Sequence, residues 1–397
     1  MSSLTTPPLS VYVHFPWCVR KCPYCDFNSY TLHGELAEDR YVEAIERDLR
    51  VQSEELQGRE VRTIFLGGGT PSLFAPRSIE RVLEATGAAF SLAPAVEVTL
   101  EANPGTIERG RFAEYRSAGV TRVSLGAQSF DAERLRILGR IHSPDETRRA
   151  AEELHSAGIS NFNLDLMYAL PGQDVGAALS DVRAALALSP AHVSHYQLTL
   201  EPGTVFAAQP PAALPGEDAA AEMLEACSQL LAEAGFAQYE VSAYARPGQR
   251  CQHNLNYWLF GDYVGAGAGA HGKLSFAAAG SIVRTVKARD PRRYLAAGQG
   301  SELRRTVPAG ELPFEFMLNA LRLVEGFEAS LFGRRTGLDW RCVSTAVEDL
   351  VRRRLLDRRA GRIRPSSLGL RFLNDLLLSF LAQSPKTTGA FGLSTAV

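Results

Sequence analysis

The sequence predicts an α/β protein in which a parallel sheet with helical crossovers is followed by a small helix-rich module. Short runs of β-branched and aromatic residues alternate with longer amphipathic segments about six times between residues 10 and 200. Glycine, proline and asparagine mark the junctions. After residue 311 the pattern changes to three helical segments around a tight turn. The alternation is typical of an open sheet or of a full or partial β/α barrel.

Each element of the first half follows from its own pattern and its own boundary residues. The segment 10–15 (SVYVHF) is short, apolar and rich in β-branched and aromatic residues, which predicts a strand, whereas 36–56 is charged and amphipathic, which predicts a helix. The predicted strands are 10–15, 61–66, 96–101, 120–126, 162–167 and 192–199. The predicted helices are 36–56, 77–90, 107–117, 144–157 and 175–188.

The second half is less regular. A segment rich in proline and alanine, 203–219, predicts a linker, and 217–234 predicts a helix. Residues 238–290 are expected to form short strands and glycine-rich loops. Three helices and one turn then suggest a winged-helix-like module, and a tail of small and polar residues is expected to be disordered. These helices are 312–323, 339–356 and 368–381, the turn is 361–365 and the tail is 383–397.

Composition narrows the class of protein. The 397 residues are 45% hydrophobic and 22% charged, with a net charge of -2, which gives no reason to expect a nucleic-acid partner. A local basic cluster is interpreted as a solvated helix face; it comprises Arg352, Arg353, Arg354, Arg358 and Arg359. No apolar run approaches the roughly 20 residues of a membrane helix, and the N-terminus does not resemble a signal peptide. We therefore expect a cytoplasmic protein with reduced thiols.

Three of the six cysteines lie within eight residues, at Cys18, Cys22 and Cys25. Three thiolates in a C-x3-C-x2-C segment can hold three irons of a cubane cluster, which leaves the fourth iron open to a small molecule. A structural zinc site would need four ligands. Such a site could recruit His14 or His33, so zinc remains an alternative at this stage.

Polar and glycine residues stand where predicted strands end. Gly67–Gly69 follow one strand, Glu101 closes the next, and Gln128 and Asp165 lie at the ends of two others. In β/α barrels the carboxyl ends of the strands form the active-site face. The sequence therefore predicts that these residues share one site.

The cysteine spacing, with Tyr24 before the third cysteine, resembles the signature of the radical S-adenosylmethionine (SAM) superfamily. Gly67-Gly-Gly-Thr-Pro71 is similar to the glycine motif of that superfamily, in which bare backbone lets the SAM amino group approach main-chain carbonyls. The resemblance implies a partial (β/α)6 TIM-type barrel that carries a [4Fe–4S] cluster and SAM.

Further stretches resemble the oxygen-independent coproporphyrinogen III oxidase (HemN) group of that superfamily. They include Glu101-Ala-Asn-Pro104, Arg122–Phe130 and Asn163–Pro171. The resemblance implies a tail at 1–9, a barrel at 10–240, a connecting segment at 241–305 and a HemN-type C-terminal domain at 306–382. It also implies SAM contacts at Tyr12, Gly68, Gly69, Thr70, Glu101, Gln128, Arg140 and Asp165.

Two features distinguish branches within this group. The decarboxylating oxidases carry a further cysteine where this chain has Phe27, which puts porphyrinogen decarboxylation in doubt. The H-N-x-x-Y-W box at 253–258 resembles the HemW haem chaperones. It implies haem as cargo, with contacts at His253, Tyr257 and Trp258. The alternative is a radical SAM coproporphyrinogen III oxidase, in which a 5'-deoxyadenosyl radical abstracts hydrogen from a porphyrinogen propionate.

The same resemblance implies recipient haemoproteins such as respiratory enzymes at the cytoplasmic membrane face. It gives the cluster a role in haem transfer or in formation of a homodimer rather than in redox turnover. Gly267–Gly272 fits G-x-G-x-x-G, but it follows a turn-like segment and no helix is expected after it, so we do not interpret it as a dinucleotide site. His271 within it is expected to be a buried histidine, or else a second contact to haem or to a substrate.

Overall fold

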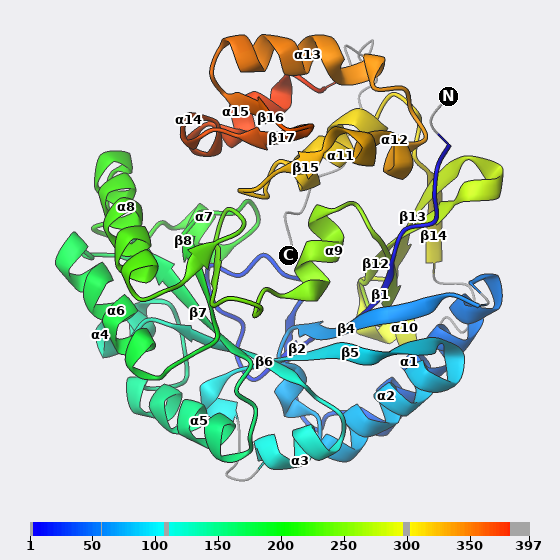
Figure 1. Ribbon diagram of the computed structural model, residues 1–397. Coiled ribbons are helices and arrows are strands. Elements are labelled where there is room, and N and C mark those ends of the chain that lie inside the picture. Colours follow the sequence, from blue (N-terminus) through cyan, green and yellow to red (C-terminus); the bar gives the residue numbers. More distant parts are fainter. Residues whose placement is uncertain (1–2, 57, 107–110, 297–301, 382–397) are drawn as a thin grey trace.

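A twelve-stranded sheet organises the computed structural model, which describes residues 3–56, 58–106, 111–296 and 302–381 (Figure 1). The strand order is β14-β13-β12-β11-β1-β4-β5-β6-β7-β8-β10-β9. The seven strands from β11 to β8 in this order are parallel, and the pairs outside them are antiparallel. Among the described residues, the end strands β14 and β9 do not pair with each other, so the sheet is a partial barrel.

The first half contains the repeating strand–helix units that the sequence predicts. Its strands are β1 (Leu9–Phe15), β2 (Trp17–Cys18), β3 (Tyr30–Thr31), β4 (Glu60–Gly68), β5 (Ser91–Ala102), β6 (Arg122–Gln128), β7 (Phe162–Tyr168) and β8 (His192–Gln197). Its helices are α1 (Glu38–Glu55), α2 (Pro76–Ala89), α3 (Arg111–Ser117), α4 (Ala132–Ile137), α5 (Pro144–Ser156), α6 (Val175–Ala187), α7 (Val205–Ala208) and α8 (Glu217–Glu233).

Helices cover the convex face of this sheet, as Figure 1 shows for α1, α2, α3, α5 and α6. Their apolar faces pack on the strands; in α1, for example, Tyr41, Val42 and Ile45 are fully buried. Local signals set the helix boundaries. Ser143 and Glu146 form a capping box at the start of α5, and the Asp174 side chain caps α6. Because these signals are local, the predicted boundaries of the crossover helices lie within a few residues of the observed ones.

Residues 238–290 differ from the expectation of strands and loops alone. They contain strands β9 (Ala237–Gln238), β10 (Ala243–Ala245), β11 (Asp262–Ala266), β12 (His271–Phe276) and β13 (Ser281–Lys287), followed by α10 (Pro291–Ala296) and β14 (Glu302–Thr306). They also contain a helix, α9 (Gln252–Trp258), that lies on the concave side of the sheet (Figure 1). The H-N-x-x-Y-W box is therefore helical.

The C-terminal module has a core of its own. It consists of α11 (Leu312–Ala320), β15 (Phe327–Glu328), α12 (Ala329–Thr336), α13 (Arg341–Arg352), β16 (Leu356–Arg359), β17 (Arg362–Pro365), α14 (Ser367–Arg371) and α15 (Leu373–Leu378). At its centre Phe316 contacts both Phe327 and Phe332 edge to face. Leu4, from the N-terminal segment, is buried in the same cluster. The predicted tight turn at 361–365 proves to be part of the β16–β17 hairpin.

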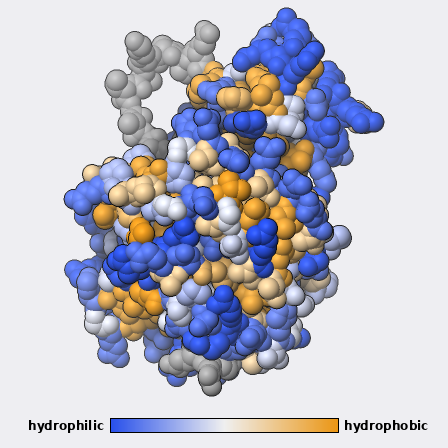
Figure 2. All heavy atoms as spheres, turned by 90° about the vertical axis from the view of Figure 1, so that its left-hand side faces the viewer, coloured by the Kyte–Doolittle hydropathy of each residue, from blue (hydrophilic) through white to orange (hydrophobic). Residues whose placement is uncertain are grey.

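Figure 2 shows hydrophobic and hydrophilic side chains interspersed over the face of the molecule that it presents. No described helix is both long and apolar enough to cross a membrane. The predicted fold class is confirmed as mixed α/β with a helical C-terminal region. Residues 107–110, at the start of one predicted helix, and the predicted tail 383–397 lie outside the described residues.

Candidate functional site

The three clustered cysteines lie in the loop region that follows β1. Cys18 ends β2, which pairs with β3, and the backbone amide of Cys25 donates a hydrogen bond to the carbonyl of Cys22. All three side chains are half-buried and free of disulfides. The loop therefore presents three thiols from one short segment at the carboxyl end of β1.

This donor set fits a cubane cluster better than a single ion. Among the described residues, no three histidine, cysteine, aspartate or glutamate side chains converge as the ligands of one metal ion would. His14 is not a free fourth ligand, because its ring nitrogens lie 2.9 Å from the Tyr12 hydroxyl and 2.9 Å from the Asn28 carbonyl oxygen. Three thiolates that each bind a different iron need no common centre. The arrangement thus favours the cluster over the zinc alternative.

The glycine motif after β4 closes tightly on the strand that leads into the cysteine loop. The amide of Gly69 donates to the Phe15 carbonyl over 2.7 Å, and the amide of Thr70 donates to the Trp17 carbonyl over 2.8 Å. A β-carbon on Gly69 would lie 2.6 Å from the Trp17 carbonyl oxygen. Gly68 has a φ of +112°, which only glycine adopts readily. Glycine is therefore required at both positions for the loop to seat against the cysteine segment.

Two half-buried carboxylates, Glu101 and Asp165, lie beside this loop. Glu101 Oε2 accepts a hydrogen bond from the Gly68 amide over 2.9 Å, and burial raises the pKa of Glu101 to about 7. Asp165 accepts hydrogen bonds from Ser124 and Asn163, and burial raises its pKa as well. The negative charge of Asp165 is a further cause of the raised pKa of Glu101, so the two groups are neighbours. An ammonium group bound beside them would favour the ionised carboxylates and lower the pKa of both groups.

Arg140 brings a cation to the cysteines. Its Nη2 donates to the Gly126 carbonyl over 2.8 Å, and its Nη1 lies 3.7 Å from Cys22 Sγ. Its Nε is buried and has no hydrogen-bond partner in the described structure. Nearby, Gln128 has a left-handed backbone (φ +66°), and its side-chain oxygen accepts a 2.6 Å hydrogen bond from the Tyr196 hydroxyl. An incoming carboxylate could accept a hydrogen bond from the unpaired Nε of Arg140.

Tyr12 connects this site to the interior of the barrel. Its hydroxyl bonds to His14 Nδ1, and its ring stacks on Phe65 with centroids 6.2 Å apart. Burial, and then the nearby charge of Glu101, raise the pKa of Tyr12 well above its usual value. The structure thus gathers Tyr12, the glycine motif, Glu101, Gln128, Arg140 and Asp165 around the cysteine loop.

Of the predicted haem contacts, His253 and Trp258 are buried and Tyr257 is half-buried. His253 on α9 is 1% exposed; its Nδ1 is 2.8 Å from the Thr63 hydroxyl and its Nε2 is 3.1 Å from the Tyr257 hydroxyl. Burial lowers the pKa of His253 to about 3. Trp258 is buried beneath Arg322 of the C-terminal module. Neither residue reaches a ligand in this conformation, so haem contact at His253 and Trp258 would require α9 to rearrange.

Polar contacts that the sequence analysis did not identify fix α9 in this position. Glu97 of β5 accepts hydrogen bonds from the amides of Gln252 and His253, which places an anion at the helix N-terminus. Trp258 packs against the Arg322 guanidinium group, with Cζ 4.3 Å from the ring centroid. Nothing local in the box signals these partners, because Glu97 precedes it by more than 150 residues and Arg322 follows it by more than 60.

The glycine-rich segment 267–272 packs closely against β1 and the loop that follows the cysteines. The side-chain Nδ2 of Asn28 donates a hydrogen bond to the Ala268 carbonyl, and a β-carbon on Gly269 would lie 2.2 Å from the same nitrogen. A β-carbon on Gly267 would meet the His14 carbonyl oxygen at 2.4 Å. A strand, β11, does precede this segment, but a strand and not a helix follows it. Its glycines therefore serve close packing against the cysteine loop.

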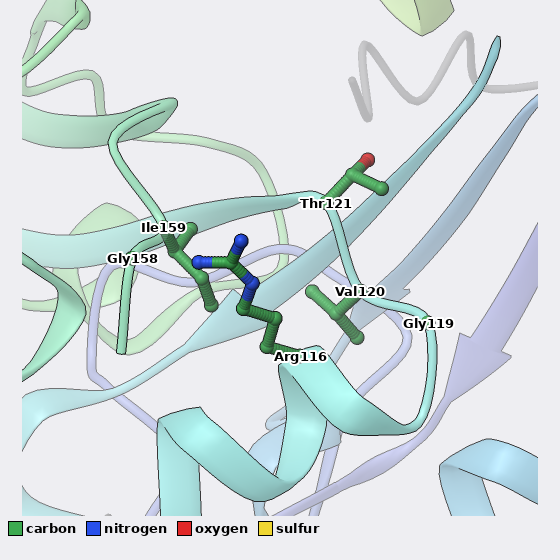
Figure 3. Close-up of a pocket in the computed structure, with 6 residues that line it drawn as sticks. All are labelled: Arg116, Gly119, Val120, Thr121, Gly158 and Ile159. Atoms are coloured by element: carbon green, nitrogen blue, oxygen red, sulfur yellow. The ribbon is translucent and has the colours of Figure 1, made fainter. Parts of the chain in front are cut away.

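A pocket of about 260 Å³ lies at the other end of the sheet, where α3 turns into β6 (Figure 3). It is lined by Arg116, Gly119, Val120, Thr121, Gly158 and Ile159. Arg116 Nη1 donates to the Ala157 carbonyl over 2.8 Å across it. Because the pocket lies at the amino ends of β6 and β7, it is separate from the cysteine site.

Comparison with known proteins agrees with these features. The Radical SAM superfamily model matches residues 12–182, and the HemN C-terminal domain model matches residues 307–372. Heme chaperone HemW of Escherichia coli (strain K12) is 48% identical over 377 residues, which cover 95% of this chain and 99% of that protein. Radical S-adenosyl methionine domain-containing protein 1, mitochondrial, of Bos taurus is 38% identical and covers 94% of this chain and 87% of its own length.

The solved structure of coproporphyrinogen III oxidase (HemN) from Escherichia coli matches 95% of this chain and 91% of its own, with a TM-score of 0.80 and 20% identity. At that identity the likeness shows the fold alone. The near full-length identity with HemW proteins is more specific, and it agrees with the cysteine loop, the glycine motif and the H-N-x-x-Y-W helix. The chain therefore belongs to the HemW family of the radical SAM superfamily.

Proposed function

We propose that this protein is a haem chaperone, which binds haem and delivers it to recipient haemoproteins. The observation that carries this proposal is the 48% identity with the heme chaperone HemW of Escherichia coli over 99% of that protein's length. The proposal includes a [4Fe–4S] cluster on Cys18, Cys22 and Cys25, as the radical SAM superfamily implies. It also includes action in the cytoplasm and transfer of haem to enzymes at the membrane face.

The residues around the cysteine loop support a SAM-loaded cluster in the proposal. When bound, the cluster supplies an open iron that SAM can coordinate. Glu101 would take the ammonium group of SAM, because no cation of the described residues pairs with its half-buried carboxylate. Arg140 would take the carboxylate with its orphaned Nε. Asp165 would accept hydrogen bonds from the ribose hydroxyls, which Gln128 and Tyr12 flank in the proposed site.

The second candidate is a radical SAM coproporphyrinogen III oxidase, which the structural likeness to HemN suggests at the level of fold. Against it stands Phe27, a half-buried phenylalanine whose carbonyl oxygen accepts a hydrogen bond from Lys21. Position 27, where the oxidases carry a cysteine, therefore has no thiol in this chain. We therefore rank decarboxylation below haem delivery.

The test uses full-length protein reconstituted anaerobically with iron and sulfide. Hemin is bound, excess is removed, and the loaded protein is mixed with a haem-depleted respiratory haemoprotein whose activity is then measured. We expect recovery of activity that exceeds the recovery with the same concentration of free hemin. Equal recovery would contradict a chaperone. In parallel, reduced protein with SAM and coproporphyrinogen III should give no decarboxylated product; sustained turnover would replace our proposal with the oxidase.

A further inference from the structure

A row of polar side chains crosses four neighbouring strands of the sheet, β5 to β8 (Figure 1). Strand register places in this row Glu101 (β5), Ser124 (β6), Asn163 (β7) and His192 (β8). Residues that pair across strands present their side chains on one face, as do residues two apart along a strand, so Asp165 shares that face. The row therefore leads from two proposed SAM contacts, Glu101 and Asp165, to a histidine that is not among those contacts.

His192 is buried and makes two hydrogen bonds through its ring. It is 2% exposed; its Nδ1 lies 2.6 Å from Asn163 Oδ1, and its Nε2 lies 2.8 Å from the Tyr239 hydroxyl. Burial, and then the charge of Arg122, lower the pKa of His192 well below its usual value, so the ring is neutral at pH 7. A neutral imidazole donates from one nitrogen and accepts at the other. The direction of the two hydrogen bonds therefore depends on which nitrogen carries the proton.

Both ends of this hydrogen-bonded chain require the same direction. At one end Asn163 Nδ2 lies 2.7 Å from Asp165 Oδ1, and an ionised carboxylate can only accept. At the other end the Tyr239 hydroxyl accepts from the Cys251 amide over 3.4 Å, and among the described residues His192 Nε2 is the only acceptor for the hydroxyl proton. Tyr239 therefore donates to Nε2, and His192 Nδ1 donates to Asn163 Oδ1.

The Asn163 amide in turn arranges the acceptor positions of Asp165. Oδ1 of Asp165 accepts from Asn163 Nδ2, and Oδ2 accepts from the Ser124 hydroxyl over 3.2 Å. Each carboxylate oxygen has about two acceptor positions, so these two bonds leave one position on each oxygen. Two such positions on one carboxylate match the two neighbouring hydroxyl groups of a ribose. The same donors oppose the effect of burial, which raises the pKa of Asp165, and so favour its ionised form.

The orientation of the Asn163 amide depends more on His192 than on its other neighbour. Ser194 also donates to Asn163 Oδ1, over 3.1 Å, but a hydroxyl accepts as readily as it donates and therefore permits either orientation. His192 lies closer, and the Tyr239 hydroxyl fixes its proton on Nδ1. Without His192 the amide could turn its oxygen towards Asp165, where two acceptors would face each other.

We propose that His192 is a positioning residue for the ribose of SAM. It holds the Asn163 amide in the orientation that keeps Asp165 ionised and leaves one acceptor position on each carboxylate oxygen for the two ribose hydroxyls. The inference rests on the proposed SAM site and adds to it a side chain that does not touch the cofactor itself.

The test is calorimetric titration of anaerobically reconstituted full-length protein with SAM and with its 2'-deoxyribose analogue. We expect His192→Leu to bind SAM about tenfold more weakly. The preference for SAM over the analogue should fall at least about threefold, because Asp165 no longer favours a diol. His192→Asn should stay within about threefold of wild type, since an asparagine amide can take the place of Nδ1 as the donor.

The matched control is His195→Leu, on the same strand. His195 is also 2% exposed, its Nδ1 has no hydrogen-bond partner among the described residues, and its position three residues from His192 places it on the opposite face of the sheet. His195→Leu should therefore keep the wild-type affinities for SAM and for the analogue. Iron and acid-labile sulfide per chain should match wild type in every variant.

Unchanged SAM affinity in His192→Leu would overturn the inference. Equal weakening of SAM and of the analogue would also overturn it, because general loosening of the fold does not depend on the ribose hydroxyls. Should His192→Leu not fold, Tyr239→Phe tests the chain from its other end: it frees the proton of His192 and should weaken SAM about threefold, and unchanged affinity there would contradict the proposal. If wild-type protein binds no SAM, the proposed SAM site itself fails.

Discussion

The guanidinium group of Arg322, in the C-terminal module, lies over the indole ring of Trp258 with Cζ 4.3 Å from the ring centroid. The same arginine pairs with Glu240 over 3.1 Å, and the Glu240 side chain is only 4% exposed. One residue of the module thus holds both the H-N-x-x-Y-W helix and a buried carboxylate near β10.

Arg322→Ala should therefore destabilise the protein. The substitution leaves Glu240 buried without its cation, which costs about 2–3 kcal/mol after allowance for the partial exposure of Arg322. We expect a lower free energy of unfolding in urea and a Tm lower by several degrees. The control is Arg341→Ala, which removes an exposed pair with Asp339 and should change little. Equal losses in the two variants would show that the contact is unimportant.

The raised pKa of Glu101 predicts a pH dependence of SAM binding. Without SAM, Glu101 has a pKa of about 7, so below pH 7 it is increasingly protonated and must lose a proton to pair with an ammonium group. The SAM dissociation constant should then rise about fivefold between pH 7 and pH 6 and level off above pH 8. Calorimetric titrations at several pH values measure this. Glu101→Gln should bind weakly at every pH; a retained pH profile in that variant would assign the titration to another group.

The same group affects the stability of the SAM-free protein in a defined direction. The pKa of Glu101 is higher in the folded chain than the ordinary value near 4.3, so the folded state holds the proton more tightly. Its contribution to stability is complete below about pH 4 and is lost as the pH rises towards 7. SAM should reverse this trend, because its ammonium group stabilises the ionised form. Thermal unfolding with and without SAM at pH 6 and pH 8 checks the sign.

Gly69→Ala should impair cofactor binding more than folding. A β-carbon there would lie 2.6 Å from the Trp17 carbonyl oxygen and 2.7 Å from that of Phe15, so the glycine loop must move away from the cysteine segment. We expect lower iron and acid-labile sulfide per chain and weaker SAM binding. Gly216→Ala is the matched control, because nothing lies within 4 Å of its added β-carbon and its φ is -71°. Normal cluster content in Gly69→Ala would contradict the packing argument.

Cysteine substitutions should distinguish the three proposed cluster ligands from the other cysteines of the chain. Cys18→Ala, Cys22→Ala and Cys25→Ala should each lose the cluster absorbance, whereas Cys342→Ala, at an exposed cysteine, should retain it. Metal analysis should find iron with acid-labile sulfide and only background zinc. Stoichiometric zinc without sulfide would restore the zinc alternative. Chelation of the iron should abolish SAM binding and leave the helical content measured by circular dichroism unchanged.

The sequence was most informative where structure depends on neighbours in the chain. The crossover helices carry their own caps, as Ser143 and Asp174 do, and the strands carry their own apolar runs. The cysteine spacing and the three glycines are equally local. The helix α9 could not be predicted in this way, because it has seven residues and its stabilising partners, Glu97 and Thr63, come from distant strands. The expectation that His271 is buried was wrong, because its side chain, at the start of β12, is exposed.

The contacts of α9 also have a consequence for how the chain can be divided. A fragment that ended at residue 240 would lack the helix that satisfies Glu97 and Thr63, and it would leave β1 without its neighbour β11. The polar interior and one sheet edge would then be open to water and to other chains. The barrel half and the segment that follows it should therefore behave as one cooperative folding unit.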